Sequence, residues 1–209
     1  MTMTSIESVT LEVPDLTAAE RFYADVFSLG PKLHLRACDD PTSGFRAFTL
    51  SLTAPQPGNV TALINAALEA GATTLKPVAK SFWGFGGVVQ APDGTIWKVA
   101  TSNKKDTGPV TREFDQMVLL LGVADVAVSK KFYVGHGLSV AKAFGRKYVE
   151  FDAPSDSVKF ALYGHKALAK DAGVPPEGSG SHRLIIDTDA GSFTDPDGFA
   201  WTAGTGPAT

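Results

Sequence analysis

The chain contains an internal repeat, and this repeat restricts the possible folds more than any other feature of the sequence. Residues 9–23 (VTLEVPDLTAAERFY) and 119–133 (LLLGVADVAVSKKFY) both run from an apolar strand through Val-x-Asp to a Phe-Tyr pair. Residues 86–100 (GGVVQAPDGTIWKVA) and 190–204 (AGSFTDPDGFAWTAG) share Pro-Asp-Gly followed three residues later by Trp. Because both matches occur in the same order, they indicate a duplication.

Hydrophobic periodicity predicts a succession of strands and helices in each half. Val9, Leu11 and Val13 alternate with polar residues, which is typical of a half-buried strand. After that strand, the first half is expected to hold a helix at 17–29, strands at 32–37 and 45–52, a helix at 60–70 and a hairpin of 88–90 with 95–100. The second half is expected to hold strand 115–123, helix 125–135, strands 139–144, 147–152, 158–163 and 182–187, and a final hairpin about Pro196-Asp197-Gly198. We therefore predict two domains, 1–102 and 112–206, joined by a polar linker, 103–111.

Composition excludes several classes of protein. Of 209 residues, 44% are hydrophobic and 20% are charged, which is ordinary for a soluble globular protein. The net charge is −3 and the basic residues are scattered, so neither nucleic acid nor a membrane surface is an expected partner. Cys38 is the only cysteine, which excludes an intrachain disulfide and a cysteine-based zinc or redox site. No secretion signal or spanning segment is recognisable, so a cytoplasmic location is expected by default.

The motifs of the repeat resemble those of the vicinal oxygen chelate superfamily, which includes glyoxalase I, extradiol dioxygenases and bleomycin-binding proteins. The likeness rests on the strand-Val-x-Asp-helix-Phe-Tyr start and the Pro-Asp-Gly-x-x-Trp end, and it covers nearly the whole chain twice. It implies an α+β fold of tandem βαβββ modules, whose curved mixed sheets form cups with helices on the outer face. Both halves look shortened, one by a hairpin and the other by a helix. Whether each half closes its own cup or the halves complete each other stays open at this stage.

The resemblance also implies where a divalent metal would be held. The positions of the family's usual ligands carry Ser8 and Val118 on the first strands and Lys98 and Thr202 on the last strands. His182 fits a further ligand position, which Phe45 occupies in the first half. A divalent ion needs several converging anionic or neutral donors, and Lys98 is a cation. We therefore expect no metal and no cofactor.

The candidate ligand-binding residues follow from strand parity and from the same comparison of positions. Ser8, Thr10 and Glu12 lie opposite the apolar face of their strand, so they either line a cup or face solvent. Lys98 occupies a cup position and would orient an anionic ligand, with Glu12 as a competing partner; the alternative is a surface lysine. Phe82 and Trp83 belong to an aromatic and glycine-rich stretch that either lines the cavity or packs in the core.

The candidate acid/base residues are Glu12, His34 and His182. Glu12 and His34 could meet across neighbouring strands, and His182 either acts as an acid/base or is a hydrogen-bonded strand histidine. Trp97 and Trp201 correspond across the repeat, which favours a packing role.

Three functions remain open on this basis. The first is a module that binds a small, partly aromatic and anionic molecule. The second is an enzyme, either a metal-free acid/base catalyst or a lyase or dioxygenase with atypical ligands. The third is an interaction protein whose cups are filled by side chains. Domains of this family often associate, so a homodimer also stays open.

Overall fold

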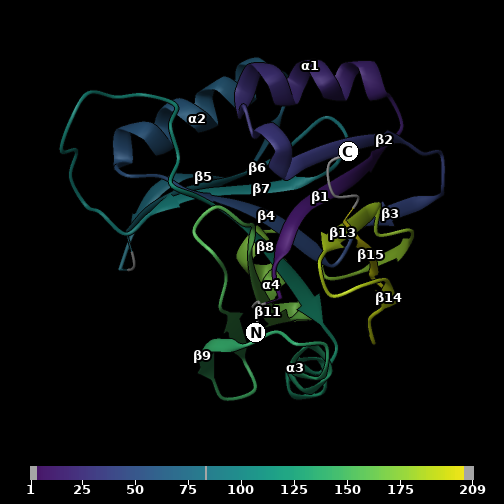
Figure 1. Ribbon diagram of the computed structural model, residues 1–209. Helices are drawn as coiled ribbons and strands as arrows, with labels where there is room; N and C mark the ends of the chain where they lie inside the picture. The colour runs from purple at the N-terminus through teal and green to yellow at the C-terminus, as the bar shows by residue number, and fades with distance from the viewer. Residues whose placement is uncertain (1–3, 83, 205–209) are drawn as a thin grey trace, which may run out of the picture.

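The computed structural model describes residues 4–82 and 84–204, and its strands form two large sheets and one two-stranded sheet (Figure 1). In the first half the elements are β1 (Ile6–Val13), α1 (Leu16–Val26), a 3₁₀ turn (Gly30–Lys32), β2 (Leu33–Ala37), β3 (Thr42–Gly44), β4 (Phe48–Thr53), α2 (Pro57–Glu69), β5 (Thr73–Ser81), β6 (Gly84–Gln90) and β7 (Ile96–Thr101). In the second half they are β8 (Gln116–Val123), α3 (Val126–Gly135), β9 (Val140–Phe144), β10 (Tyr148–Phe151), β11 (Lys159–Gly164), α4 (His165–Ala172), β12 (Gly178–Gly180), β13 (Leu184–Thr188), β14 (Phe193–Thr194) and β15 (Ala200–Ala203).

Each large sheet takes strands from both halves of the chain. The eight-stranded sheet has the order β5-β6-β7-β4-β8-β11-β10-β9, and the five-stranded sheet has the order β14-β15-β13-β1-β2. The halves join through antiparallel pairing of β4 with β8 in the first sheet and of β1 with β13 in the second. The two halves therefore complete each other's sheets, which the sequence had left open. That residues 1–102 and 112–206 are two domains joined by the linker 103–111 stays a prediction.

The repeated Val-x-Asp motif forms the junction between a strand and its helix, as predicted. Val9, Leu11 and Val13 are fully buried. Asp15 then caps α1 by accepting a hydrogen bond from the Ala18 amide at 2.9 Å, and Asp125 caps α3 in the same way. An aspartate at this position satisfies amide groups that have no partner within the helix.

Three helices cover the outer faces of the sheets, as expected for this fold class. Helix α1 lies along β2 and beside α2, α2 packs on β6 and β7, and α3 packs on β10 and β11 (Figure 1). Trp97 and Trp201 lie in the core beneath them, with 0% and 1% exposure. Among the described residues, no helix is both long and apolar enough to cross a membrane.

The structure departs from the predicted elements at β5 and α4, neither of which the sequence pattern predicted. Strand β5 is a largely exposed edge strand and contains Pro77, so it lacks the alternation of a half-buried strand. Helix α4 has only eight residues and lies between the predicted strands 158–163 and 182–187, where no helix was predicted. It packs on the inner face of the eight-stranded sheet, whereas the three predicted helices lie on the outer faces.

The predicted shortening of both halves agrees with the observed elements. Between β2 and β4, where every residue is described, the chain forms only β3, which pairs with β12 in a separate two-stranded sheet. Between β13 and β14, which are likewise described throughout, the chain makes a short turn with no helix.

Candidate functional site

The inner face of the eight-stranded sheet, here called the cup face, is partly filled by α4. Leu168, Ala169 and Ala172 of this helix are at most 2% exposed. They pack against the strand residues Val88, Ile96, Leu120 and Ala161. Hydrophobic residues next to these four in the chain point to the opposite face of the sheet and belong to the main hydrophobic core. The protein's own helix thus occupies the middle of the cup that the fold implies.

Lys98 of β7 lies on the cup face and forms an ion pair with α4. Its ammonium Nζ donates to the Asp171 carboxylate Oδ2 at 2.7 Å. The two side chains are 34% and 38% exposed, so solvent screens the pair in part. Glu12, expected as the competing partner, lies on the five-stranded sheet instead. The expectation that Lys98 and Glu12 share one cup is wrong, because β1 and β7 belong to different sheets.

An open cavity of about 370 Å³ lies beside the C-terminal end of α4. Strands β5, β6 and β7 form its floor and walls, with Lys76, Lys80 and Lys98 among the lining residues. Gly86 and Ala100 face each other in register, so this part of the floor has no large side chain. A cavity of this size is typical of small-molecule sites.

Lys76 connects this cavity to the helix. Its ammonium donates at 2.7 Å to the backbone carbonyl groups of both Lys170 and Asp171. Both carbonyls belong to the last turn of α4, where a cation interacts favourably with the helix dipole, and the Lys170 carbonyl also accepts from the Gly173 amide at 3.2 Å. Lys76 therefore holds the C-terminal end of α4 against the cavity.

Two polar side chains on the cup face complete this region. Ser51 of β4 stands between Lys98 and Val118 in the strand register, and its buried Oγ has no hydrogen-bond partner among the described residues. Burial raises the pKa of Tyr163 of β11, and the nearby Asp171 carboxylate raises it further. The Tyr163 phenol is therefore protonated at neutral pH and can donate a hydrogen bond.

A second cavity, of about 410 Å³, lies beside the segment that follows α4. Its lining includes Phe45, Ile96, Val174 and Pro175. Ile96 belongs to the same strand as Lys98 and to the same cluster as the buried residues of α4. The two cavities lie toward opposite ends of the β6–β7 pair, the first near Gly84 and Thr101 and the second near Gln90 and Ile96.

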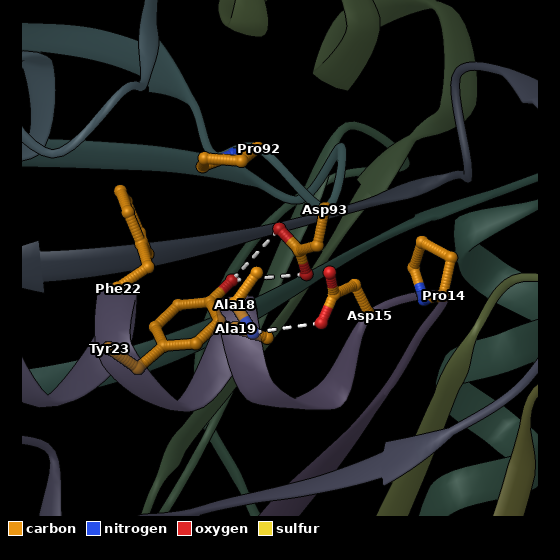
Figure 2. Close-up of a pocket in the computed structure, with 8 residues that line it drawn as sticks. All are labelled: Pro14, Asp15, Ala18, Ala19, Phe22, Tyr23, Pro92 and Asp93. Carbon is orange, nitrogen blue, oxygen red and sulfur yellow. Dashed lines mark hydrogen bonds between the residues drawn. The ribbon is translucent and has the colours of Figure 1, made fainter.

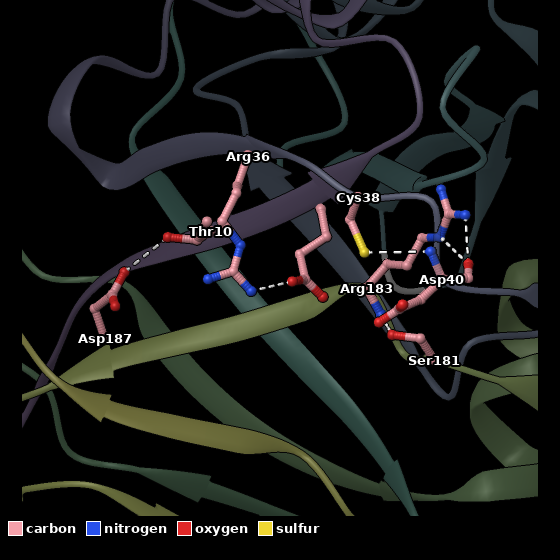
Figure 3. A network of polar contacts seen from close by, with 8 residues as sticks. Thr10, Arg36, Cys38, Asp40, Ser181, Arg183 and Asp187 are labelled. Carbon is pink, nitrogen blue, oxygen red and sulfur yellow. Dashed lines mark hydrogen bonds and ion pairs between the residues drawn. The ribbon is translucent and has the colours of Figure 1, made fainter.

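Ser8 and Thr10 lie on the inner face of the five-stranded sheet, where they surround a carboxylate. Asp187 of β13 accepts hydrogen bonds from the hydroxyls of Ser8 at 2.8 Å, Thr10 at 3.2 Å and Thr202 at 2.7 Å. Figure 3 shows the Thr10–Asp187 contact together with the neighbouring polar groups. Ser8 is only 6% exposed, so its side chain does not face solvent.

Glu12 lies further along the same face and pairs with Arg36 rather than with His34. The Glu12 carboxylate accepts a charge-assisted hydrogen bond from the Arg36 guanidinium, which stands opposite it in register. His34 stands opposite Thr10, so the proposed contact between Glu12 and His34 is not formed. The pair of Glu12 and Arg36 lines a cavity of about 330 Å³.

His182 lines the same cavity, but both ring nitrogens face backbone carbonyl groups. Nδ1 lies 2.9 Å from the Arg46 oxygen and Nε2 lies 3.1 Å from the Asp197 oxygen. The ring also stacks on Phe199 at a centroid distance of 4.0 Å. These contacts link three segments of the chain. They agree better with a structural, hydrogen-bonded histidine than with an acid/base residue whose ring nitrogens are free.

The aromatic stretch at the tip of the β5–β6 hairpin is described only in part. Phe82 is 82% exposed, and its neighbours Ser81 and Gly84 line the cavity that contains Lys98. Trp83 lies outside the described residues, so its predicted place in the cavity stays a prediction.

A smaller pocket, on the outer side of the molecule, has a structural explanation. It lies between α1 and the turn at Pro92-Asp93, has a volume of about 60 Å³ and is mostly apolar (Figure 2). The Tyr23 hydroxyl bonds to both Asp93 oxygens at 3.2 Å across it. Its volume accommodates only a few water molecules, so we do not assign it a ligand.

The same arrangement of modules occurs in known enzymes. Glyoxalase I from Zea mays aligns with a TM-score of 0.61 at 16% identity, over 95% of this chain and 91% of that chain, and a variant of that enzyme aligns at 0.63 and 15% over the same shares. The chain has the glyoxalase fold. A putative dioxygenase from Bacillus subtilis subsp. subtilis str. 168 aligns at 0.55 and 12% identity, over 89% of this chain and 70% of that chain. No protein-family model matches the sequence, and no curated protein matches it either.

The glyoxalase fold of this chain brings the four family ligand positions together in two pairs. Ser8 and Thr202 both donate to Asp187, whereas Val118 and Lys98 flank Ser51. Each pair joins the first strand of one half to the last strand of the other. The exchange of strands between the halves thus explains why positions that are distant in the sequence meet.

Neither pair fits a divalent ion. The pair on the eight-stranded sheet contains an ammonium and an apolar side chain, and the other surrounds one carboxylate that already accepts three hydroxyl groups. Zinc and hard divalent ions need several anionic or neutral donors at short range. Within residues 4–82 and 84–204, no three His, Cys, Asp or Glu side chains are grouped so that they could hold a metal.

Asp171, Asp187 and Arg36 make the main polar contacts of the two faces, yet they were not among the residues predicted from the sequence. Asp171 depends on α4, whose signal is weak: Leu168 and Ala172 at helical spacing, followed by Gly173 as a C-terminal stop. Arg36 shares the parity of His34, so strand alternation could have placed it beside Glu12.

Proposed function

We propose that this protein binds a small, partly aromatic and anionic molecule in the cavity beside α4, without a metal ion. The observation that carries the proposal is Lys98, a cation that lines an open cavity and pairs with Asp171, a carboxylate of the protein itself. An anionic ligand can take the place of that carboxylate at little electrostatic cost.

The charge of the cavity favours an anion. Lys76, Lys80 and Lys98 line it together with a single carboxylate, Asp171. Lys76 also stabilises the end of α4, and Lys80 is exposed at the rim. Since the lysines outnumber the carboxylate, the cavity has a positive potential that attracts anions.

The shape of the cavity favours a flat ligand body. Gly86 and Ala100 leave part of the floor without large side chains. Planar rings pack well on such a surface, and aromatic residues in a concave site add to the apolar contact.

An enzyme remains the second candidate, because the matched structures include glyoxalase I and a putative dioxygenase. The residues for metal-free acid/base chemistry would be Glu12, His34 and His182. Glu12 and His182 line one cavity, which supports this alternative, but Arg36 neutralises Glu12 and both nitrogens of His182 face carbonyl groups. Binding alone therefore accounts better for these contacts.

The proposal is tested by thermal shift and calorimetry with matched probes. Benzoate and phenyl phosphate should stabilise the full chain, whereas benzamide, the neutral counterpart of benzoate, should not. A charge-assisted hydrogen bond contributes about 1.5–3 kcal/mol, so Lys98→Met should weaken benzoate binding about ten- to a hundredfold. Lys166→Met, which removes an exposed lysine of α4 outside the cavity, serves as the control and should leave binding unchanged.

Two results would reject this function. The first is an equal response to benzoate and benzamide, or no response to any probe. The second concerns metal content. Protein purified without chelator should contain far less than one zinc, nickel, iron or manganese ion per chain. About one such ion per chain, lost together with activity on chelation, would contradict the proposal.

A further inference from the structure

Helix α4 presents a carboxylate and apolar side chains to the cup face at the same time. Asp171 reaches Lys98, while Leu168 and Ala172 are buried against the strands. A small carboxylate with an apolar body would offer the same combination of groups. In its chemistry, the helix therefore resembles the class of ligand that the cavity favours.

One buried group on the cup face shows an imperfect fit with its present surroundings. Ser51 lies next to Lys98 in register, and its hydroxyl is buried without a partner among the described residues. A buried hydroxyl without a hydrogen bond is unfavourable, whereas an alanine there would not be. A carboxylate held by Lys98 would supply the missing acceptor for this hydroxyl.

A glycine stands at each end of α4, where the backbone can change direction. Gly164 precedes the helix and has open space where a side chain would begin, and Gly173 follows it in the left-handed conformation at φ 81°. The polar contacts that hold the C-terminal end are made by Lys76 and Lys98, and the side chains of the Lys98–Asp171 pair are 34% and 38% exposed. Release of these contacts would widen the cavity of about 370 Å³ that Asp171 lines.

We propose that α4 is an internal competitor for the ligand: the ligand is a carboxylate with an apolar body, and it binds Lys98 and Ser51 in the place that Asp171 and Leu168 now occupy. This inference rests on the proposed function, since it concerns the same anion-binding lysine. It adds the class of ligand, a second hydrogen-bonding residue and a mechanism by which the protein limits its own affinity.

The test uses isothermal titration of the full chain with 4-phenylbutyrate, a carboxylate with a longer apolar body than benzoate. Asp171→Asn removes the competing charge and should tighten binding about tenfold, the effect of releasing one partly exposed charged contact. Asp156→Asn, in an exposed turn, is the control and should bind as wild type does. Ser51→Ala should weaken binding several-fold, yet the melting temperature of the ligand-free protein should stay the same or rise.

Hydrogen exchange of the unmodified protein gives a readout that needs no variant. Saturation with 4-phenylbutyrate should accelerate exchange of the α4 amides. Slower exchange of the α4 amides, or an Asp171→Asn variant that binds no more tightly than wild type, overturns this inference. The proposed function still holds in that case if benzoate binds in a way that depends on Lys98. If the Asp171→Asn variant binds 4-phenylbutyrate and the wild-type protein does not, both proposals are supported. If neither the variant nor the wild-type protein binds it, both proposals are rejected.

Discussion

At the scale of residues, a buried tyrosine and an aspartate join the start of each half to its final turn. Tyr23 bonds to Asp93 and accepts from the Trp97 indole at 3.3 Å. Tyr133 donates to Asp195, and burial together with this carboxylate raises the pKa of Tyr133. The two aspartates are not equivalent positions of the repeat, since Asp93 precedes its turn glycine directly and Asp195 stands three residues before Gly198.

This difference predicts unequal costs of removing the two carboxylates. Asp195 is 5% exposed and accepts from the Tyr133 hydroxyl, the Trp201 indole and two backbone amides of the turn. Because each buried donor left without a partner costs about 1–3 kcal/mol, Asp195→Ala should lower the free energy of unfolding by at least about 3 kcal/mol. Asp93→Ala, in a more exposed turn, should cost less. Urea denaturation of both variants decides the matter, and equal losses would contradict this account.

At the scale of elements, α4 determines how much of the cup is open. Its buried side chains cover part of the cup face, and its last turn carries the carboxylate that pairs with Lys98. A two-turn helix has little stability of its own, so its position depends on packing and on its flanking residues.

The flanking glycines of α4 predict opposite effects of the same substitution. Gly164 has φ −60° and no atom within 4 Å of the place that an added Cβ would take, so Gly164→Ala should be neutral or stabilise the protein by about 0.4–1 kcal/mol. Gly173 has φ 81°, and an added Cβ would lie 3.0 Å from two carbon atoms of Lys76. Gly173→Ala should therefore destabilise by about 1 kcal/mol or more. Chemical denaturation measures both, and a stabilising Gly173→Ala would show that the end of α4 is held differently.

At the scale of the whole molecule, the chain folds by exchanging strands between its halves. The eight-stranded sheet depends on the pairing of β4 with β8, and the five-stranded sheet depends on the pairing of β1 with β13. Separation of the halves would expose the edges of four strands and the apolar faces beside them.

This exchange predicts that neither half folds alone. Fragments 1–108 and 109–209, expressed separately, should show no cooperative thermal unfolding, whereas their mixture should regain strand signal and a single transition by circular dichroism. An independently folded fragment with its own sharp transition would support the predicted domains 1–102 and 112–206 instead.

The sequence by itself determined the class of fold and most of its elements. The duplicated motifs contain their own local physics: alternation buries Val9 and Val13, an aspartate caps the helix that follows, and Pro-Asp-Gly turns the chain ahead of a buried tryptophan. These signals depend only on neighbouring residues. They can therefore be recognised in the sequence even when the pairing of the strands is unknown.

Only the tertiary structure decided which residues share a site. Lys98 and Glu12 lie in one half of the chain but on different sheets, whereas Ser8 and Thr202 lie at opposite ends of the chain and share Asp187. Strand pairing between distant segments is set by the total burial of apolar faces, which no local pattern records. The placement of α4 on the cup face has the same origin, since a short helix is positioned by the surface it covers.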